Sequence, residues 1–109
     1  MARAELNGAA IIDWPSFHAA SKATFGFPDF YGNNISAWID CLSYLRDDDA
    51  MSCFRLAPNE LLTIQLLHAT NLRQRVPEIL AELEFCIAAV NERYADYGEK
   101  PALQLLLIE

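Results

Sequence analysis

One long segment with helical periodicity, residues 77–97, constrains the fold of this chain more than any other feature. Its apolar side chains recur at the three- and four-residue spacing of one helix face. They are Val76, Leu80, Leu83, Ile87, Val90, Tyr94 and Tyr97. A short apolar run lies on each side of this segment, at 61–67 and at 103–108, and such runs are typical of buried strands. Strands joined by a long helical connection predict an α/β fold with a parallel sheet.

The first half of the chain predicts a further strand and two more helices. Arg3–Asn7 is predicted as the first strand. Asp13 can cap a helix that Gly26 ends, and a second helix is predicted from about Asn34 to Arg46. A short helix is also expected between the central strand and the long helix. The whole chain, 1–109, is therefore predicted to form one domain, with a small, mostly parallel three-stranded sheet packed with helices.

The stretch before the central strand predicts an extra hairpin arm. Met51–Leu56 can pair with Leu61–Leu67 across a turn at Pro58-Asn59. Because Leu61–Leu67 is apolar almost throughout, it is predicted to lie in the centre of the sheet with both faces covered. Three consecutive acids, Asp47–Asp49, oppose the dipole of the helix before them, so this helix is expected to end at or just after Arg46.

Residue spacing separates two faces of the second helix. The apolar stripe consists of Ile35, Trp38, Leu42 and Leu45, and the opposite, polar stripe consists of Ser36, Asp40, Ser43 and Asp47. Asp40 is therefore expected to face outward, with Ile39 beside it.

The chain carries a net charge of −7, which indicates what kind of partner it can bind. Nucleic acid is not expected as a direct partner, because neutralising phosphates requires Lys and Arg. Long-range attraction favours a basic partner, although a negative charge can also serve only to keep a small protein soluble. No stretch reaches the roughly 18 apolar residues of a membrane span, so no membrane contact is expected. Residues 1–7 also lack the apolar run of a signal peptide.

The residues that carry chemistry form no recognisable catalytic set. Cys41, Cys53 and Cys86 are odd in number and lack a C-x-x-C pair, so they imply neither a disulfide framework nor a zinc site. Reduced cysteines suit the cytoplasm. His18 is expected on a helix surface and His68 at a strand end, and neither has a nucleophile with a recognisable signature. The chain is therefore expected not to be an enzyme and to need no cofactor or metal.

The segment from Phe25 to Leu42 reads FGFPDFYGNNISAWIDCL and carries a resemblance to a known family. It resembles the binding loop and second helix of barstar-family ribonuclease inhibitors, with a Pro, an acid, two aromatics, Gly, Asn and then Asp-Cys-Leu. The turn at Asn7-Gly8, His18 and the final strand after a long helix also fit that family. Asp47–Pro58 resembles an insertion relative to the best-known member, and the chain is similar to the branch associated with actinomycete ribonucleases. The resemblance implies a barstar-like fold.

The resemblance also implies a function. Members plug the active site of a small, basic, guanyl-specific ribonuclease with one helix and the loop before it. Asp40 matches the acid that takes the place of the substrate phosphate and engages the Arg, Lys and His side chains of the enzyme. The chain is thus expected to act in the cytoplasm, as a monomer in a 1:1 complex. The expected partner-binding residues are Phe30, Asn34, Ser36, Ala37, Ile39, Asp40, Tyr44 and Glu92.

Several positions depart from the family pattern and leave alternatives open. Phe30 replaces an interface tyrosine, Ser36 a second carboxylate and Ile39 an exposed tryptophan. The glutamate expected on the long helix falls on Arg93, so either the adjacent Glu92 substitutes for it or that contact is absent. The same fold could therefore serve a different basic partner, such as another toxin nuclease. An enzyme that uses one of the two histidines is a third alternative.

Overall fold

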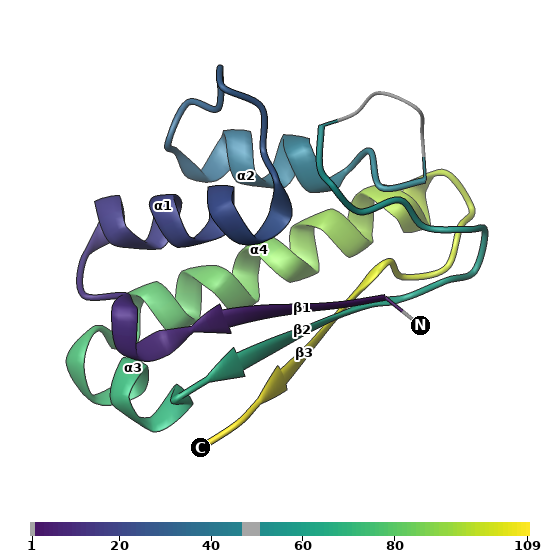
Figure 1. Cartoon of the computed structure of the whole chain (residues 1–109). Coiled ribbons are helices and arrows are strands. Elements are labelled where there is room, and N and C mark those ends of the chain that lie inside the picture. The colour runs from purple at the N-terminus through teal and green to yellow at the C-terminus, as the bar shows by residue number, and fades with distance from the viewer. Residues whose placement is uncertain (1, 47–50) are drawn as a thin grey trace.

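The computed structural model describes residues 2–46 and 51–109 of the chain (Figure 1). Three strands alternate with helices in the predicted order, with two α-helices in each connection between strands. The elements are β1 (Ala2–Asn7), the 3-10 helix η1 (Gly8–Ala10), α1 (Trp14–Phe25), α2 (Ile35–Leu42), β2 (Leu62–Leu67), α3 (Ala69–Arg75), α4 (Pro77–Asp96) and β3 (Leu103–Leu107).

The three strands form one parallel sheet with β2 in the centre. Ile64 of β2 lies opposite Ala4 of β1 on one side and opposite Leu105 of β3 on the other. The prediction of an α/β fold with a small parallel sheet and a central apolar strand is therefore confirmed.

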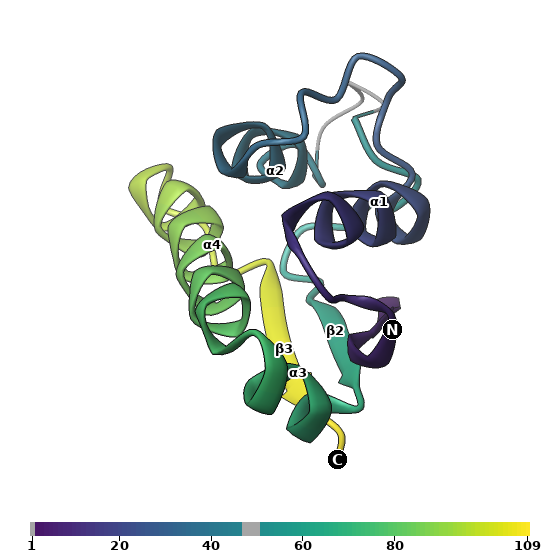
Figure 2. The same ribbon diagram turned by 90° about the vertical axis from the view of Figure 1, so that its left-hand side faces the viewer.

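The helices α1, α2 and α4 lie on one face of this sheet (Figures 1 and 2). Figure 2 shows α2 farther from the sheet than α1 and α4. Side chains of β2 alternate between buried and half-buried positions, so Leu67 is partly exposed although its neighbour Leu66 is fully buried. The expectation that both faces of β2 are covered is thus wrong, because the packed helices shield only one side.

Trp38 fixes α2 to the rest of the molecule. Its side chain is fully buried, and its Nε1 donates a hydrogen bond to Ser21 Oγ of α1 at 3.1 Å. Its ring meets that of Phe25 edge-on, with centroids 5.7 Å apart. Leu42 and Leu45 are fully buried as well. The apolar stripe therefore faces inward as predicted, and Ser36 and Asp40 of the polar stripe are exposed. The helix itself ends at Leu42 and not near Arg46, so the predicted end is wrong.

Residues 51–61 contain no strand, so the predicted hairpin arm is wrong. Cys53 N–H donates to the carbonyl of Phe25, and Leu56 N–H donates to that of Leu45, each at 2.7 Å. The segment thus bonds to the end of α1 and to the turn after α2. It cannot pair with β2, because β1 and β3 occupy both edges of that strand. The acidic triplet Asp47–Asp49 lies outside the described residues.

Candidate partner-binding site

Buried aromatic side chains hold the loop before α2, residues 26–34, in place. The hydroxyl of Tyr31 lies 2.7 Å from Nδ1 of His18, and the ring of Phe27 lies 4.6 Å from that of Tyr31. All three side chains are buried. Phe30 instead points outward and is 74% exposed. The loop therefore presents one aromatic side chain from an anchored base.

The anchor of this loop is formed by two neutral groups. Burial lowers the pKa of His18 and raises the pKa of Tyr31, which Cys41 and Cys86 raise further. The expected surface position of His18 is wrong, because the loop folds back over α1 and covers the imidazole with Tyr31.

Asn34 determines where α2 begins. Its Oδ1 accepts a hydrogen bond from Ala37 N–H at 2.7 Å, and its Nδ2 donates to the carbonyl of Gly32 at 3.3 Å. An Asn side chain in this role satisfies a backbone donor that the first turn of a helix leaves unpaired. Asn34 and the neighbouring Ser36 are exposed, and Ala37 is half-buried.

Asp40 lies on the outer side of α2, and its side chain is 54% exposed. Ile39, by contrast, is only 8% exposed and belongs to the core. The expectation that Ile39 lies at the surface beside Asp40 is therefore wrong, and its contact with a partner stays a prediction. The physical reason is that α2 packs against α4 and also contacts α1 through Trp38, so more of its surface is buried than the apolar stripe alone.

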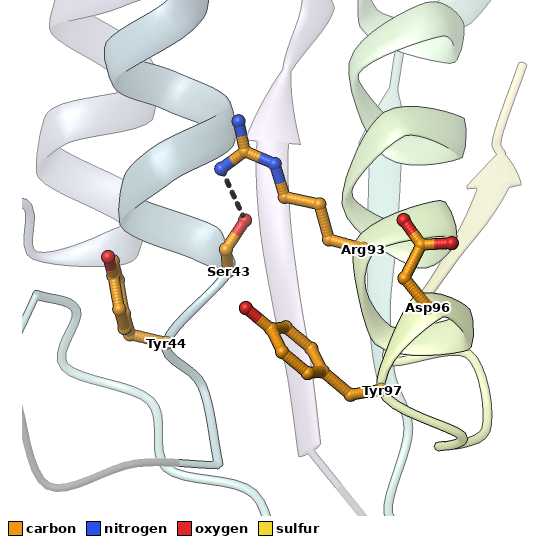
Figure 3. A pocket seen from close by; sticks show the side chains of 5 residues that line it. All are labelled: Ser43, Tyr44, Arg93, Asp96 and Tyr97. Atoms are coloured by element: carbon orange, nitrogen blue, oxygen red, sulfur yellow. Dashed lines mark hydrogen bonds between the residues drawn. The ribbon is translucent and has the colours of Figure 1, made fainter.

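The carboxylate of Asp40 is paired with a cation from the same chain. Nη1 of Arg93, on α4, donates to Oδ1 of Asp40 at 2.7 Å. The same Nη1 lies 3.2 Å from Ser43 Oγ, the bond that Figure 3 draws. The Arg93 side chain is 47% exposed. The sequence singles out Arg93 only as the position of an expected glutamate. Its pairing with Asp40 depends on how α2 packs on α4, which residue spacing does not reveal.

A hollow lies beside this ion pair, between the C-terminal ends of α2 and α4. Its lining consists of Ser43, Tyr44, Arg93, Asp96 and Tyr97 (Figure 3). Tyr97 is predicted as the last member of the core stripe but is 81% exposed. The reason is that α4 ends at Asp96 and the backbone leaves helical geometry at Tyr97. Tyr44 is also exposed.

Comparison with known proteins gives the family of the chain. The family model described as Barstar (barnase inhibitor) matches residues 1–106. The chain belongs to the barstar family. Members of this family are inhibitors that bind ribonucleases, and they are not enzymes. A search of curated proteins found no match to the chain.

In this barstar-family protein, the predicted contact residues come from three elements. Phe30 lies in the loop before α2, and Glu92 lies exposed on α4, about 100° around the helix from Arg93. The others that reach the surface lie at the start of α2, along it or just after it: Asn34, Ser36, Ala37, Asp40 and Tyr44. Their contact with a partner stays a prediction.

A buried arginine holds the end of α2 in this barstar-family fold. Arg46 donates to the carbonyls of Glu60 and Lys100, each at 2.9 Å, and its Nη1 lies 3.2 Å from Oε1 of Glu99. Its guanidinium also lies over the ring of Tyr94, 4.9 Å from the centroid. This network fixes the turn that bounds the hollow, and the helical pattern of the sequence does not indicate it.

Neither a metal site nor a membrane-spanning helix is found in the described part of the chain. Residues 2–46 and 51–109 contain no group of three or more His, Cys, Asp and Glu side chains arranged to hold a metal ion. Within the same residues, no helix is long and apolar enough to cross a membrane.

Proposed function

We propose that this protein binds a small, basic, guanyl-specific ribonuclease and occludes its active site. The observation that carries the proposal is Asp40, half-exposed on the outer side of α2. A carboxylate resembles a phosphate in charge and in the hydrogen bonds it accepts, and Arg can bind it through two parallel N–H groups. Asp40 would thus take the position of the RNA phosphate among the basic groups of the enzyme.

The loop before α2 supports the proposal with an apolar contact. Phe30 is exposed, whereas Tyr31 beside it is anchored to α1. Because the loop is already held in place, little order has to be gained when the aromatic ring meets a partner. Exposed aromatic side chains often contribute strongly to binding at protein interfaces.

The charge of the molecule supports a basic protein as the partner. The chain carries a net charge of −7, which would attract a basic ribonuclease and repel nucleic acid. The proposed complex contains one copy of each protein, needs no cofactor and involves no membrane. We place it in the cytoplasm, where the unpaired Cys41, Cys53 and Cys86 would stay reduced.

An inhibition assay with one acid removed tests this function. Asp40→Asn is expected to weaken inhibition of RNA cleavage about tenfold or more, because the partner's cations lose their counter-charge. Glu84→Gln is the matched control, since it removes the same charge from an exposed position of α4. Glu84 lies nine residues before Arg93 and so points to the opposite side of the helix. Equal inhibition by Asp40→Asn and Glu84→Gln would contradict the role of Asp40.

A second candidate is a module for a different basic partner, such as another toxin nuclease. The Asp40–Arg93 pair and the burial of Ile39 favour it, because both change the surface expected of a guanyl-specific ribonuclease inhibitor. A pull-down that recovers a basic nuclease other than a ribonuclease, together with no inhibition of any ribonuclease, would support this candidate over the first.

A further inference from the structure

Arg93 is bonded to Asp40, the side chain on which the proposed ribonuclease contact depends most. It donates to Asp40 at 2.7 Å, and it also lies within hydrogen-bond distance of Ser43. A cation this close cancels most of the field of the carboxylate at longer range. A positively charged partner is therefore attracted less strongly to Asp40 than to an unpaired acid, and it meets the charge of Arg93 as well.

We propose, building on the proposed function, that Arg93 determines which partners bind. It acts as an internal counter-ion that a basic partner must displace from Asp40. A partner with a weakly cationic site cannot compete for the carboxylate, whereas one with several Arg or Lys side chains around the docking point can. Both Asp40 and Arg93 are about half exposed, so the exchange does not leave a buried charge unpaired.

The hollow between α2 and α4 offers a position for the displaced guanidinium. It holds about 400 Å³ of space and already includes Arg93 in its lining. Asp96 lies three residues after Arg93, a spacing that makes side chains neighbours on a helix surface. The exposed rings of Tyr44 and Tyr97 border the same space (Figure 3). A carboxylate and aromatic faces are groups with which a guanidinium interacts favourably.

A charge-matched pair of variants tests the inference on a ribonuclease that the protein inhibits. Arg93→Gln removes the internal counter-ion but keeps a hydrogen-bonding side chain. Arg73→Gln is the control, because it removes the same charge from an exposed ion pair with Glu109 on another part of the molecule. We expect Arg93→Gln to bind about two- to fivefold more tightly than Arg73→Gln, the range of one exposed ion pair. Arg93→Lys, which keeps the charge, should bind like the unaltered protein.

Equal or weaker binding by Arg93→Gln than by Arg73→Gln would overturn the inference. That result would mean that Arg93 either contacts the ribonuclease directly or has no effect on binding.

A tetra-arginine peptide tests the same inference without a ribonuclease. The NMR resonance of the Asp40 carboxyl carbon reports binding of the peptide at this site. The apparent dissociation constant at Asp40 should be about two- to fivefold lower for Arg93→Gln than for Arg73→Gln. Equal constants would overturn the inference. The proposed function fails if no ribonuclease is inhibited, whereas the inference fails if the peptide constants are equal. The two failures can therefore be told apart.

Asp96→Asn tests the role of the hollow. It should weaken peptide binding more when Arg93 is present than in the Arg93→Gln background, because a displaced Arg93 uses this carboxylate, whereas the loss of one negative charge near the cationic peptide acts in both backgrounds. The same loss in both backgrounds would remove the hollow from the proposed exchange.

Discussion

At the scale of single residues, the hydrogen bond between His18 and Tyr31 ties the candidate contact loop to α1. The bond is buried and joins two neutral groups, and Phe30 extends from the same loop into solvent. A change in the charge of His18 is therefore expected to act both on the stability of the fold and on the position of the loop.

Lowering the pH is expected to destabilise the protein through His18. Burial holds its pKa below the ordinary value of 6.5, so the unfolded chain takes up a proton at pH values where the folded chain does not. The stability that neutral His18 contributes is complete above 6.5 and is lost as the pH falls from there through the folded-state pKa. Denaturant titrations between about pH 7.5 and 5 measure this loss as a lower free energy of unfolding.

Two histidine variants separate this effect from general acid sensitivity. His18→Gln should flatten the pH dependence in that window. His68→Asn is the control for loss of an imidazole, because His68 is exposed and has a positive φ of 54° that Asn tolerates. Hydrogen bonds from Ser16 lower the pKa of Asp13 from its ordinary value of 3.8. The stability that Asp13 contributes is therefore lost only as the pH falls below that value, outside the window of the His18 effect. A pH dependence that is the same in His18→Gln and the unaltered protein would contradict the account.

At the scale of elements, one side chain of α4 secures the start of β3. Oδ1 of Asn91 accepts hydrogen bonds from the backbone N–H groups of Ala102 and Leu103, at 3.0 and 2.9 Å. Its Nδ2 donates to the carbonyl of Leu103 at 3.0 Å. Asn91 thereby satisfies backbone groups of β3, which is an edge strand of the sheet that the described residues form.

Replacing Asn91 is expected to destabilise the fold. Asn91→Leu should lower the free energy of unfolding by about 1–3 kcal/mol, because partly buried backbone groups lose their partners. Asn91→Asp should cost less, since a carboxylate can still accept from Ala102 and Leu103. Chemical denaturation of the three proteins measures both values. A loss below about 0.5 kcal/mol for Asn91→Leu would contradict this role, because surface changes commonly stay within that range.

Helix and strand positions could be predicted where the signal is local. Asn34 is a good helix cap, and its side chain does start α2. Gly26 ends α1 in the left-handed conformation that favours glycine. The hairpin arm failed because apolar character in Met51–Leu56 does not show whether an edge of β2 is open. That information lies in the pairing of β1 and β3, which are distant in sequence.

The candidate site could be predicted only in part for the same reason. The outward position of Asp40 follows from residue spacing within one helix. The burial of Ile39 and the pairing of Asp40 with Arg93 depend on the packing of α2 against α4. The exposure of Tyr97 depends on where α4 ends, and helix ends are the least certain part of a prediction from periodicity.

At the scale of the whole molecule, the net charge of −7 governs how a basic partner approaches. The rate of association with an inhibited ribonuclease should fall by about tenfold or more as ionic strength rises from about 0.02 to 0.5 M. Dissociation should change much less, because close contacts are screened less than long-range attraction. Stopped-flow measurements give both rates. An association rate that does not depend on salt would contradict electrostatic attraction as the cause.

The most direct test of the central claim is a titration of this protein into an RNA-cleavage assay. The assay uses a fluorogenic substrate and a panel of small, basic, guanyl-specific ribonucleases. The account predicts that the activity of at least one of them falls to zero at one equivalent of protein, and that Asp40→Asn weakens this inhibition. Full activity of every ribonuclease at excess protein would contradict the proposed function.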